Sequence, residues 1–422
     1  SLAIVVGGGP APGINGVISA ATIEAINRGI RVYGIYKGFE RVGQGDRTAI
    51  KELTIADVSR IHLEGGAILG TSRANPRGDQ KMLDNIVALL KENDIKYLVS
   101  IGGDDTVSSA RAIAKAAGGN IAVAHTPKTI DNDLPIPGHD CTFGYQTARE
   151  VGTRIVETLM TDAKTTSRWY LTIAMGRKAG HLALGIGVSA GATITLIPEE
   201  FGAPNSKLAL STIVDTVVGS ILKRVCNGQQ HGVAVLAEGL AEILDPDSVP
   251  ELANAERDPH GHIRLAEVDF GGMVKRAVRD RLSEFGVDDI VVVDKNIGYE
   301  LRCKSPSPFD REYTRQLGYG VVDFLQNGGS DAMIIRQGEN LEALPFDKMF
   351  DDSGRSLVRL VDIESTTYKV ASKYMIRITE EDLTNPDFLS RLEGVTNASA
   401  EKLKETFAPI AFRERGCSVK IA

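Results

Sequence analysis

The chain has 422 residues, of which 42% are hydrophobic and 24% charged, a balance typical of soluble globular proteins with roughly two or three domains. Its formal net charge of −7 argues against non-specific nucleic-acid binding, and no run of about 18 apolar residues predicts a membrane span. Because no charged and apolar leader precedes the strand Leu2–Val6, and the cysteines show no paired spacing, the sequence predicts a cytoplasmic protein without disulfides or a zinc site.

A short apolar strand followed by a glycine-rich turn recurs along the chain, and helical stretches around Val17–Ile26 and Val107–Ala117 follow two of these turns. Apolar strands alternating with helices predict parallel sheets covered on both faces, which is the doubly wound α/β fold. In such folds, ligands bind beyond the carboxyl ends of the strands. The predicted strands are Leu2–Val6, Tyr97–Ile101, Trp169–Met175 and Gly232–Ala237.

The first candidate site is the glycine-rich segment Gly7–Asn15. Glycines directly after a strand let backbone amides approach an anion, and the N-terminus of the following helix favours negative charge. The segment has neither the Gly-Lys-Ser/Thr of a P-loop nor the Gly-x-Gly-x-x-Gly spacing of a dinucleotide site. It therefore predicts a phosphate site of another kind, with a tight strand-to-helix turn as the alternative.

The second candidate site is Gly102–Thr106, where Asp104 and Asp105 stand together between a strand and a helix. One carboxylate at such a place can simply cap the helix. It can also hold Mg²⁺, which prefers hard oxygen ligands and needs few of them from the protein. The second interpretation is preferred here.

The third candidate site is Pro127–Asp133, which follows the apolar strand Ile121–Ala124. Turns use Asp and Asn heavily, so a purely structural turn is one interpretation. Seven residues with this many donors and acceptors favour a functional site instead. An aspartate here can take the proton of an attacking hydroxyl, as general-base catalysis requires.

Taken together, these segments resemble those of the phosphofructokinases. The resemblance extends over roughly residues 2–330, and its Thr-Ile-Asp-Asn-Asp string is nearly diagnostic of the family. It rests on motifs in the family's order: Gly102-Gly103-Asp104, Thr129-Ile130-Asp131-Asn132-Asp133, Met175-Gly176-Arg177, Glu238-Gly239 and Ser305-Pro306-Ser307-Pro308-Phe309-Asp310-Arg311.

The resemblance implies two doubly wound domains with mostly parallel sheets and an active site in the cleft between them. Residues 1–144 with about 302–360 are expected to bind the phosphoryl donor and Mg²⁺. Residues 145–301 with about 361–422 are expected to bind the sugar phosphate. A surface insertion is predicted at about 245–262, where His260 and His262 are expected to be solvated rather than metal ligands.

Residue roles follow from the same resemblance. Asp131 is expected to deprotonate the 1-hydroxyl of fructose 6-phosphate, with Thr129 and Asp133 beside it, and Asp104 is expected to bind the cofactor Mg²⁺. Arg168 is similar to an arginine that reaches the substrate from a neighbouring subunit, which implies a homodimer or homotetramer. Other predicted contacts are Gly9, Arg73 and Lys128 to pyrophosphate, and Thr129, Ile130, Met175, Gly176, Arg177, Glu238, Tyr299, Glu300, Leu301 and Arg302 to the sugar phosphate, with Tyr299 standing where relatives often have His.

Two positions resemble the branch of the family that uses pyrophosphate instead of ATP. These are Asp105 and Lys128, at which the ATP-using enzymes have Gly. The Asp105 carboxylate is expected to be buried where the α-phosphate of ATP would bind. Like charges about 4 Å apart at an effective dielectric near 20 repel by roughly 4 kcal/mol. Lys128 is expected to place a positive charge over the transferring phosphoryl group. Phe39, where a nucleotide-binding relative can have Tyr, is a weaker difference.

The implied function is reversible, Mg²⁺-dependent transfer of a phosphoryl group from pyrophosphate to fructose 6-phosphate. One alternative is an ATP-dependent phosphofructokinase. Another is a non-catalytic regulatory subunit that binds a sugar phosphate, although such subunits tend to lose the base. The Gly-x-Ser-x-Gly pattern at Gly187–Gly191 does not predict a serine hydrolase, because a helical stretch precedes it and the strand Ala192–Ile197 follows, the reverse of the required order.

Overall fold

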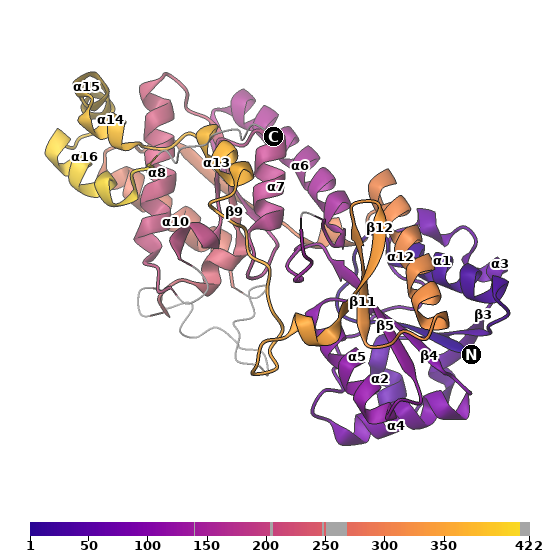
Figure 1. The fold of residues 1–422 in the computed structure, drawn as a ribbon. Helices are drawn as coiled ribbons and strands as arrows, with labels where there is room; N and C mark the ends of the chain where they lie inside the picture. The colour runs from indigo at the N-terminus through magenta and orange to yellow at the C-terminus, as the bar shows by residue number, and fades with distance from the viewer. Residues whose placement is uncertain (139, 203–205, 247–248, 250–267, 414–422) are drawn as a thin grey trace, which may run out of the picture. The chain divides into compact units, whose positions relative to one another are not determined.

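The computed structural model describes residues 1–138, 140–202, 206–246, 249 and 268–413 (Figure 1). The chain divides into two compact units, each made of two separate stretches of sequence. Unit 1 comprises Ser1–Ala148 and Tyr299–Arg359, and unit 2 comprises Arg149–Gly298 and Leu360–Ala422. The family resemblance implies the corresponding boundaries near residues 144, 301 and 360.

Unit 1 is built on a mainly parallel sheet. Its strands are β1 (Leu2–Val6), β2 (Val32–Ile35), β3 (Ile50–Leu53), β4 (Tyr97–Gly102), β5 (Ala122–Thr129), β6 (Phe143–Gly144), β11 (Ala332–Gln337) and β12 (Asn340–Pro345). Within the described residues the sheet has eight strands in the order β12-β11-β5-β4-β1-β2-β3, with β6 also paired to β5. The edge strands β3 and β12 run antiparallel to their neighbours, whereas the central strands are parallel.

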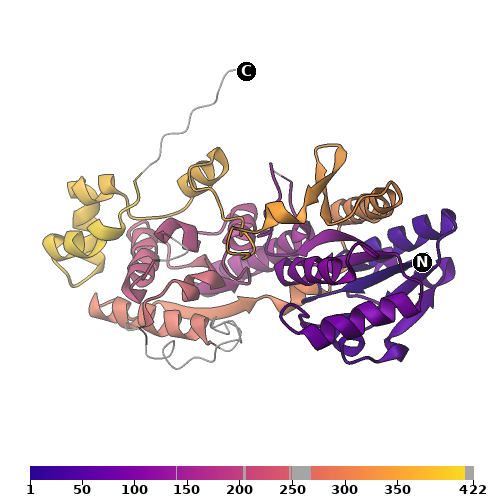
Figure 2. The same ribbon diagram turned by 60° about the horizontal axis from the view of Figure 1, so that its bottom comes forward.

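Helices cover both faces of this sheet (Figures 1 and 2). Successive residues of β1 alternate between the two faces: Leu2, Ile4 and Val6 pack with helices α1 and α12, whereas Ala3 and Val5 pack with α2, α4 and α5. Every residue of β1 is buried, as expected for a central parallel strand. The helices of unit 1 are α1 (Ile14–Asn27), α2 (Gly38–Gly43), α3 (Ile55–Val58), α4 (Gln80–Glu92), α5 (Asp104–Ala117), α11 (Tyr299–Arg302) and α12 (Pro308–Gln326), and α6 (Tyr145–Thr166) begins in unit 1 and continues into unit 2.

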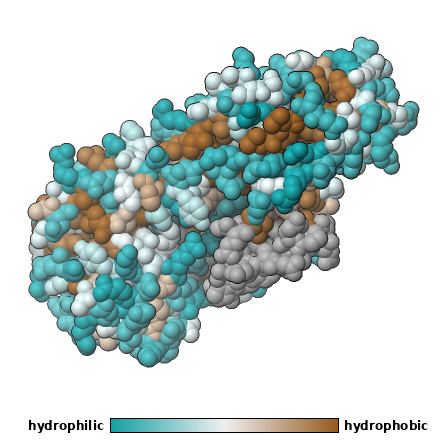
Figure 3. Space-filling view, turned by 180° about the vertical axis from the view of Figure 1, so that it is seen from behind, coloured by the Kyte–Doolittle hydropathy of each residue, from teal (hydrophilic) through white to brown (hydrophobic). Residues whose placement is uncertain are grey.

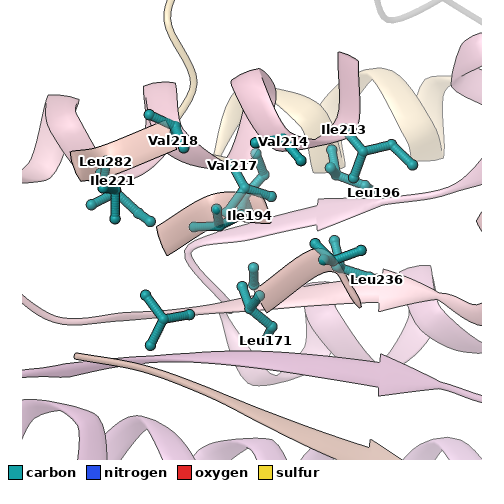
Figure 4. Packing of buried hydrophobic residues seen from close by; sticks show 14 of the residues in the cluster. Leu171, Ile194, Leu196, Ile213, Val214, Val217, Val218, Ile221, Leu236 and Leu282 are labelled. Carbon is teal, nitrogen blue, oxygen red and sulfur yellow. The ribbon is translucent and has the colours of Figure 1, made fainter. Parts of the chain in front are cut away.

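Unit 2 contains a second parallel sheet, with the order β10-β7-β9-β8 among the described residues. Leu171, Ile194 and Leu236 from this sheet pack against Val217 and Ile221 of a long helix (Figure 4). The strands are β7 (Arg168–Ala174), β8 (Ile194–Leu196), β9 (Gly232–Ala237) and β10 (Val291–Ile297). The helices are α7 (His181–Ala190), α8 (Leu210–Cys226), α10 (Phe270–Glu284), α13 (Thr366–Lys373), α14 (Glu380–Thr384), α15 (Pro386–Val395) and α16 (Ala400–Phe407).

The segment beyond Asp362 is helical where the structure describes it. Within residues 362–413, Thr379 forms an isolated bridge with Phe412, and there is no named strand. A buried ion pair at 2.8 Å between Arg377 and Glu200 fixes the tail to unit 2. The aromatic ring of Phe407 stacks on that of Phe285 in the same core.

The predicted fold class, α/β with doubly wound and mostly parallel sheets, is confirmed. Trp169 is fully buried near the start of β7, as its position in an apolar strand indicated. Helix α7 precedes Gly191 and β8 follows it, so the chain has the order that excludes a serine-hydrolase turn. Most of the predicted insertion at 245–262, including His260 and His262, lies outside the described residues.

Hydrophobic and hydrophilic residues are mixed on the face seen in Figure 3. Among the described residues, no helix combines the length and the apolar character needed to span a membrane. Cys141, Cys226 and Cys303 are free thiols, and Cys417 lies outside the described residues.

Helices α1 and α12 pack closely because small residues face each other where they cross. A β-carbon added at Gly318 would lie 2.6 Å from the β-carbon of Ala20 and 2.9 Å from the backbone oxygen of Val17. The backbone of α1 cannot yield as a flexible side chain would. The helix pair therefore requires glycine at this position.

We expect Gly318→Ala to lower the free energy of unfolding by about 1–3 kcal/mol, because the added methyl group overpacks the helix crossing. Gly394 provides a matched control on the exposed surface of α15, where an added β-carbon meets no atom within 4 Å. Gly394→Ala should be neutral or stabilise by up to about 1 kcal/mol. Urea unfolding measures both variants, and equal effects would contradict the close-packing argument.

Candidate active site

Three predicted site segments meet at one edge of the unit 1 sheet. Strand β4 lies between β1 and β5, and all three strands run in parallel. In register, Val6 is opposite Ile101 and Gly102 is opposite Pro127. The turns that follow these strands therefore lie side by side, although they are far apart in the sequence. Strand β5 continues to Thr129, beyond the predicted end at Ala124, so part of the third candidate segment is strand and not loop.

The turn after β1 packs directly against α5. A β-carbon at Gly7 would lie 2.4 Å from the side-chain oxygen of Thr106, so a larger residue would have to displace that side chain. The amide of Gly7 donates to the carbonyl of Ile101 at 2.9 Å, and that of Gly8 donates to the carbonyl of Ser72 at 2.8 Å. These bonds hold the turn in place beside the end of β4.

The side chain of Lys128 lies against this turn and donates a hydrogen bond of 2.6 Å from Nζ to the carbonyl oxygen of Gly9. Only 5% of Lys128 is exposed, and burial lowers its pKa to about 8, although the nearby carboxylates of Asp131, Asp104 and Asp133 oppose this shift. The charge of Lys128 at neutral pH is thus maintained by the aspartates around it.

Arg302 adds a second cation beside the same turn. Its guanidinium carbon would lie 3.6 Å from a β-carbon at Gly9, and its charge acts with burial to lower the pKa of Lys128. The guanidinium also lies over the ring of Tyr299, 5.2 Å from the centroid. Residues up to 301 were expected in the sugar-phosphate domain, whereas α11 (Tyr299–Arg302) belongs to unit 1. Leu301, a predicted contact of the sugar phosphate, is fully buried.

Asp104 and Asp105 occupy the first turn of α5, where the helix N-terminus favours negative charge. Asp104 is partly exposed. Asp105 is exposed, and the expectation that this acid is buried is wrong. As the second residue of the helix, Asp105 points away from the packed side of α5, which Thr106 and Val107 occupy.

His125 supports the turn after β4 from within the sheet. It is completely buried, with Nε2 3.0 Å from the carbonyl of Gly102 and Nδ1 2.7 Å from the hydroxyl of Ser100. Since a carbonyl only accepts, Nε2 carries the proton and Ser100 donates to Nδ1. Burial lowers the pKa of His125 to about 3. The neutral ring therefore fixes the carbonyl that precedes Gly103 and Asp104.

The loop Thr129–Asp133, called here the carboxylate loop, is held by hydrogen bonds between side chains and backbone, both within the loop and to Thr142. The amide of Asp131 donates to the Thr129 hydroxyl at 3.0 Å, and 7% of Asp131 is exposed. Asn132 has a left-handed backbone with φ of 59°, and its side-chain oxygen accepts from the amide of Thr142 at 3.0 Å. The Thr142 hydroxyl in turn donates to the carbonyl of Thr129 at 2.7 Å. Ile130, between Thr129 and Asp131, is buried.

Arg73 follows Ser72, whose backbone forms a parallel bridge with Gly7, and its side chain is exposed next to the glycine turn. Phe39 is 1% exposed and packs within the hydrophobic core of unit 1. Asn15, the last residue of the first candidate segment, binds the backbone of Glu64, Gly65 and Ile68 with its side-chain amide. Asn15 thus holds a neighbouring loop.

The remaining predicted residues belong to unit 2. Glu238 accepts hydrogen bonds on Oε1 from the amides of Gly176 (3.0 Å) and Arg177 (2.9 Å), so it shapes the turn after β7. Arg177 is exposed on this turn with a left-handed φ of 46°. Unit 1 holds Gly9, Arg73, Asp104, Asp105, Lys128, Thr129, Ile130, Asp131, Asp133, Tyr299, Glu300, Leu301 and Arg302, and unit 2 holds Arg168, Met175, Gly176, Arg177 and Glu238.

Two buried supports of the site were not predicted as site residues, His125 and Asp310. Asp310 is fully buried and accepts from the amides of Gly144 and Thr147, each at 2.9 Å. Gly144 belongs to β6, which pairs with Lys128 and Thr129. His125 could have been predicted as a support because it is a polar residue in an apolar strand. Asp310 entered the sequence prediction only as part of the motif Ser305–Arg311. Among the described residues, no group of three or more His, Cys, Asp or Glu side chains could hold a metal ion.

Comparison with known proteins identifies close relatives. Residues 1–325 match the family model described as Phosphofructokinase. Over 415 residues the chain is 50% identical to a protein of Thermotoga maritima named pyrophosphate–fructose 6-phosphate 1-phosphotransferase, covering 96% of this chain and 97% of that protein. A protein of the same name from Naegleria fowleri is 48% identical over 415 residues, covering 96% of this chain and 95% of that protein.

A solved structure shares the fold. The structure described as pyrophosphate-dependent phosphofructokinase from Nitrosospira multiformis matches with a TM-score of 0.67, covering 100% of this chain and 93% of that one. The sequence identity is 17%, so this likeness concerns the fold alone.

The buried His125 predicts a specific loss of stability in acid. Its folded-state pKa of about 3 lies below the usual 6.5, so between these pH values the unfolded chain binds a proton that the folded chain does not. Stability therefore falls as the pH falls. From pH 7 to pH 5, we expect wild type to lose about 2 kcal/mol more unfolding free energy than His125→Gln. Urea unfolding at both pH values tests this, and parallel losses in the two proteins would refute it.

Proposed function

The chain belongs to the phosphofructokinase family, and on that premise we propose that it transfers a phosphoryl group from pyrophosphate to the 1-hydroxyl of fructose 6-phosphate. The hydroxyl oxygen attacks one phosphorus atom, the bridging P–O bond of pyrophosphate breaks, and inorganic phosphate leaves. The products are fructose 1,6-bisphosphate and phosphate. One phosphoanhydride is exchanged for one phosphate ester, and the reaction runs in both directions. The proposal places the enzyme in glycolysis.

The observation that carries this proposal is the buried ammonium of Lys128 on the glycine turn. Its Nζ is bonded to the Gly9 carbonyl and would lie 3.2 Å from a β-carbon at Gly8. Positive charge so close to a phosphate-binding turn stabilises a bare diphosphate directly. In a site that excludes water, such preorganised charge acts more strongly on the transition state than it would in solvent. Binding of the anion would also raise the pKa of Lys128 and keep it protonated.

Asp131 is the proposed general base. It lies on the carboxylate loop after Lys128 and is largely buried, with its backbone tied to Thr129. Its carboxylate is proposed to take the proton of the 1-hydroxyl as the new O–P bond forms. Thr129 and Asp133, on either side, are proposed to orient the loop and the substrate. The neighbouring ammonium of Lys128 keeps negative charge on this loop favourable.

Mg²⁺ is the proposed cofactor, with Asp104 as its protein ligand. Mg²⁺ usually keeps several waters and takes one or two carboxylates together with substrate phosphates. A single, partly exposed aspartate beside the phosphate turn fits this requirement, whereas a site built of three protein ligands is not needed. The ion would supply neutralising charge to the diphosphate.

The two units are proposed to divide the substrates. Unit 1 would bind pyrophosphate through Gly9, Arg73 and Lys128. The turn Met175–Arg177 with Glu238, in unit 2, would bind the sugar. Arg302 of unit 1 would also contact the 6-phosphate through a charge-assisted bond, with Tyr299 beside it. An arginine such as Arg168 that serves a neighbouring subunit would require a homodimer or homotetramer, and we propose such an assembly in the cytoplasm.

Two alternatives are disfavoured. A regulatory subunit needs no base, yet Asp131, Lys128 and their supports are all in place in unit 1. An ATP-dependent enzyme would have to accommodate a nucleotide beside Asp105. Because Asp105 is exposed, solvent weakens its repulsion of a nucleotide to a value nearer 1 than 4 kcal/mol, on the order expected at high dielectric. Lys128 therefore carries more of the argument for pyrophosphate than Asp105 does.

Initial rates with fructose 6-phosphate and Mg²⁺ test the proposed function. We expect kcat/KM with pyrophosphate to exceed that with ATP by about 100-fold or more, since the relevant interactions are worth several kcal/mol. Formation of fructose 1,6-bisphosphate is measured by a coupled assay in which the donor is varied. Equal or faster turnover with ATP would contradict the donor assignment, and no turnover with either donor would contradict catalysis.

Substitution of Asp105 measures how far this residue excludes ATP. Asp105→Gly removes both charge and bulk and should raise kcat/KM for ATP by about 5- to 10-fold, because the repulsion at an exposed site is screened to about 1 kcal/mol. Asp105→Asn removes the charge and keeps the bulk, so the difference between the two variants separates repulsion from steric exclusion. If neither variant gains activity with ATP, Asp105 has no part in donor choice.

A further inference from the structure

Arg359 lies beyond residues 1–325, which match the family model, yet it contacts the carboxylate loop. It is the last residue of unit 1, directly before the chain enters unit 2. Its backbone amide donates to the carbonyl of Asp133 at 2.7 Å. Its guanidinium donates from Nε to the carbonyl of Asn132 at 3.1 Å and from Nη2 to the side-chain oxygen of Asn132.

The same guanidinium also binds the segment that follows the carboxylate loop. From Nη1 it donates to the carbonyls of Ile136 at 3.2 Å and Asp140 at 2.7 Å. Burial lowers the pKa of Arg359, and the nearby Asp133 carboxylate is among the groups that oppose this shift. Because a guanidinium is a planar fork of five donors, one side chain can bind four oxygens that diverge in this way.

These bonds act on the most constrained residue of the loop. Asn132 is in the left-handed region, which residues other than glycine rarely adopt, although Asn tolerates it better than most. The backbone direction at Asn132 determines where Asp131 and Asp133 stand relative to Lys128. Arg359 binds both the carbonyl and the side chain of Asn132, and so holds this conformation from outside the loop.

We propose that Arg359 is a positioning residue for phosphoryl transfer, which keeps the Asp131 carboxylate in place by fixing Asn132. The inference rests on the proposed function, because it takes Asp131 as the base. Donor binding depends on a different set of bonds, those of Gly7, Gly8 and Lys128. Loss of Arg359 should therefore lower kcat much more than it changes KM for pyrophosphate.

The experiment compares Arg359→Ala and Arg359→Lys with Arg281→Ala as a matched control. Arg281 is also partly buried and binds Asp215 with two nitrogens, at 2.7 and 3.2 Å, but it joins α10 to α8 in unit 2. Each full-length protein is assayed for kcat, KM and urea unfolding, using whichever phosphoryl donor the wild type accepts. Guanidinium chloride is then added at concentrations well below those that unfold the protein.

We expect kcat to fall by about 100-fold in Arg359→Ala and about 10-fold in Arg359→Lys, because small misplacements of a catalytic group cost this much. Low guanidinium should restore kcat of Arg359→Ala saturably, by about 5-fold or more, since the ion can occupy the vacated donor site. Arg281→Ala should keep its kcat and show no such rescue, even if it loses stability.

Two results would overturn the proposal. One is a kcat for Arg359→Lys within about twofold of wild type. This measurement can be made even if Arg359→Ala does not fold. The other is a loss of kcat in Arg359→Ala that follows the unfolded fraction and does not respond to guanidinium. The wild-type rate alone decides the proposed function, whereas the ratio of variant to wild type decides the role of Arg359. The two failures are therefore distinguishable.

Discussion

The site depends on one buried cation, the ammonium of Lys128, which is bonded to the Gly9 carbonyl and lies near the aspartates of two neighbouring turns. Burying a charge is costly unless it is paired and hydrogen-bonded. The parallel order β1-β4-β5 supplies that pairing, because it brings the ends of three strands to one edge of the sheet. The glycine turn, the carboxylates and the lysine thus stabilise one another, and the site is a consequence of strand order as much as of residue type.

A second layer of residues fixes the backbone on which these groups stand. His125 binds the carbonyl of Gly102, Asp310 binds the amide of Gly144, and Arg359 binds Asn132. Each contact joins a side chain to a backbone group of a different segment. Catalytic geometry requires such support, since groups displaced by about 1 Å lose much of their effect. In unit 2, the Glu238 side chain likewise binds backbone amides of a turn, those of Gly176 and Arg177.

The sequence predicts correctly those features of the structure that depend on local residue patterns. The strands Leu2–Val6 and Gly232–Ala237 have the predicted bounds because continuous apolar runs end at glycine or glutamate. The glycine turn and the aspartates were recognisable because such residues rarely gather without a ligand. Arg359 could not be found this way, since its partners lie more than two hundred residues earlier. Nor does a Gly-Gly-Asp-Asp string reveal that Asp105 faces solvent, because helix packing decides the direction of each side chain.

The sheet of unit 1 also has a consequence for synthesis of the chain. Strand β5 needs β11 as its neighbour, but β11 begins at Ala332, about 200 residues after β5 ends. At about 5–20 residues per second, a ribosome takes about 10–40 s to cover that distance. During this interval one side of β5, at Ala124 and His125, lacks the strand that pairs with it in the folded protein. A nascent chain with such an open strand edge is a natural target for chaperones, and crowded ribosomes translating the same message would expose matching edges to one another.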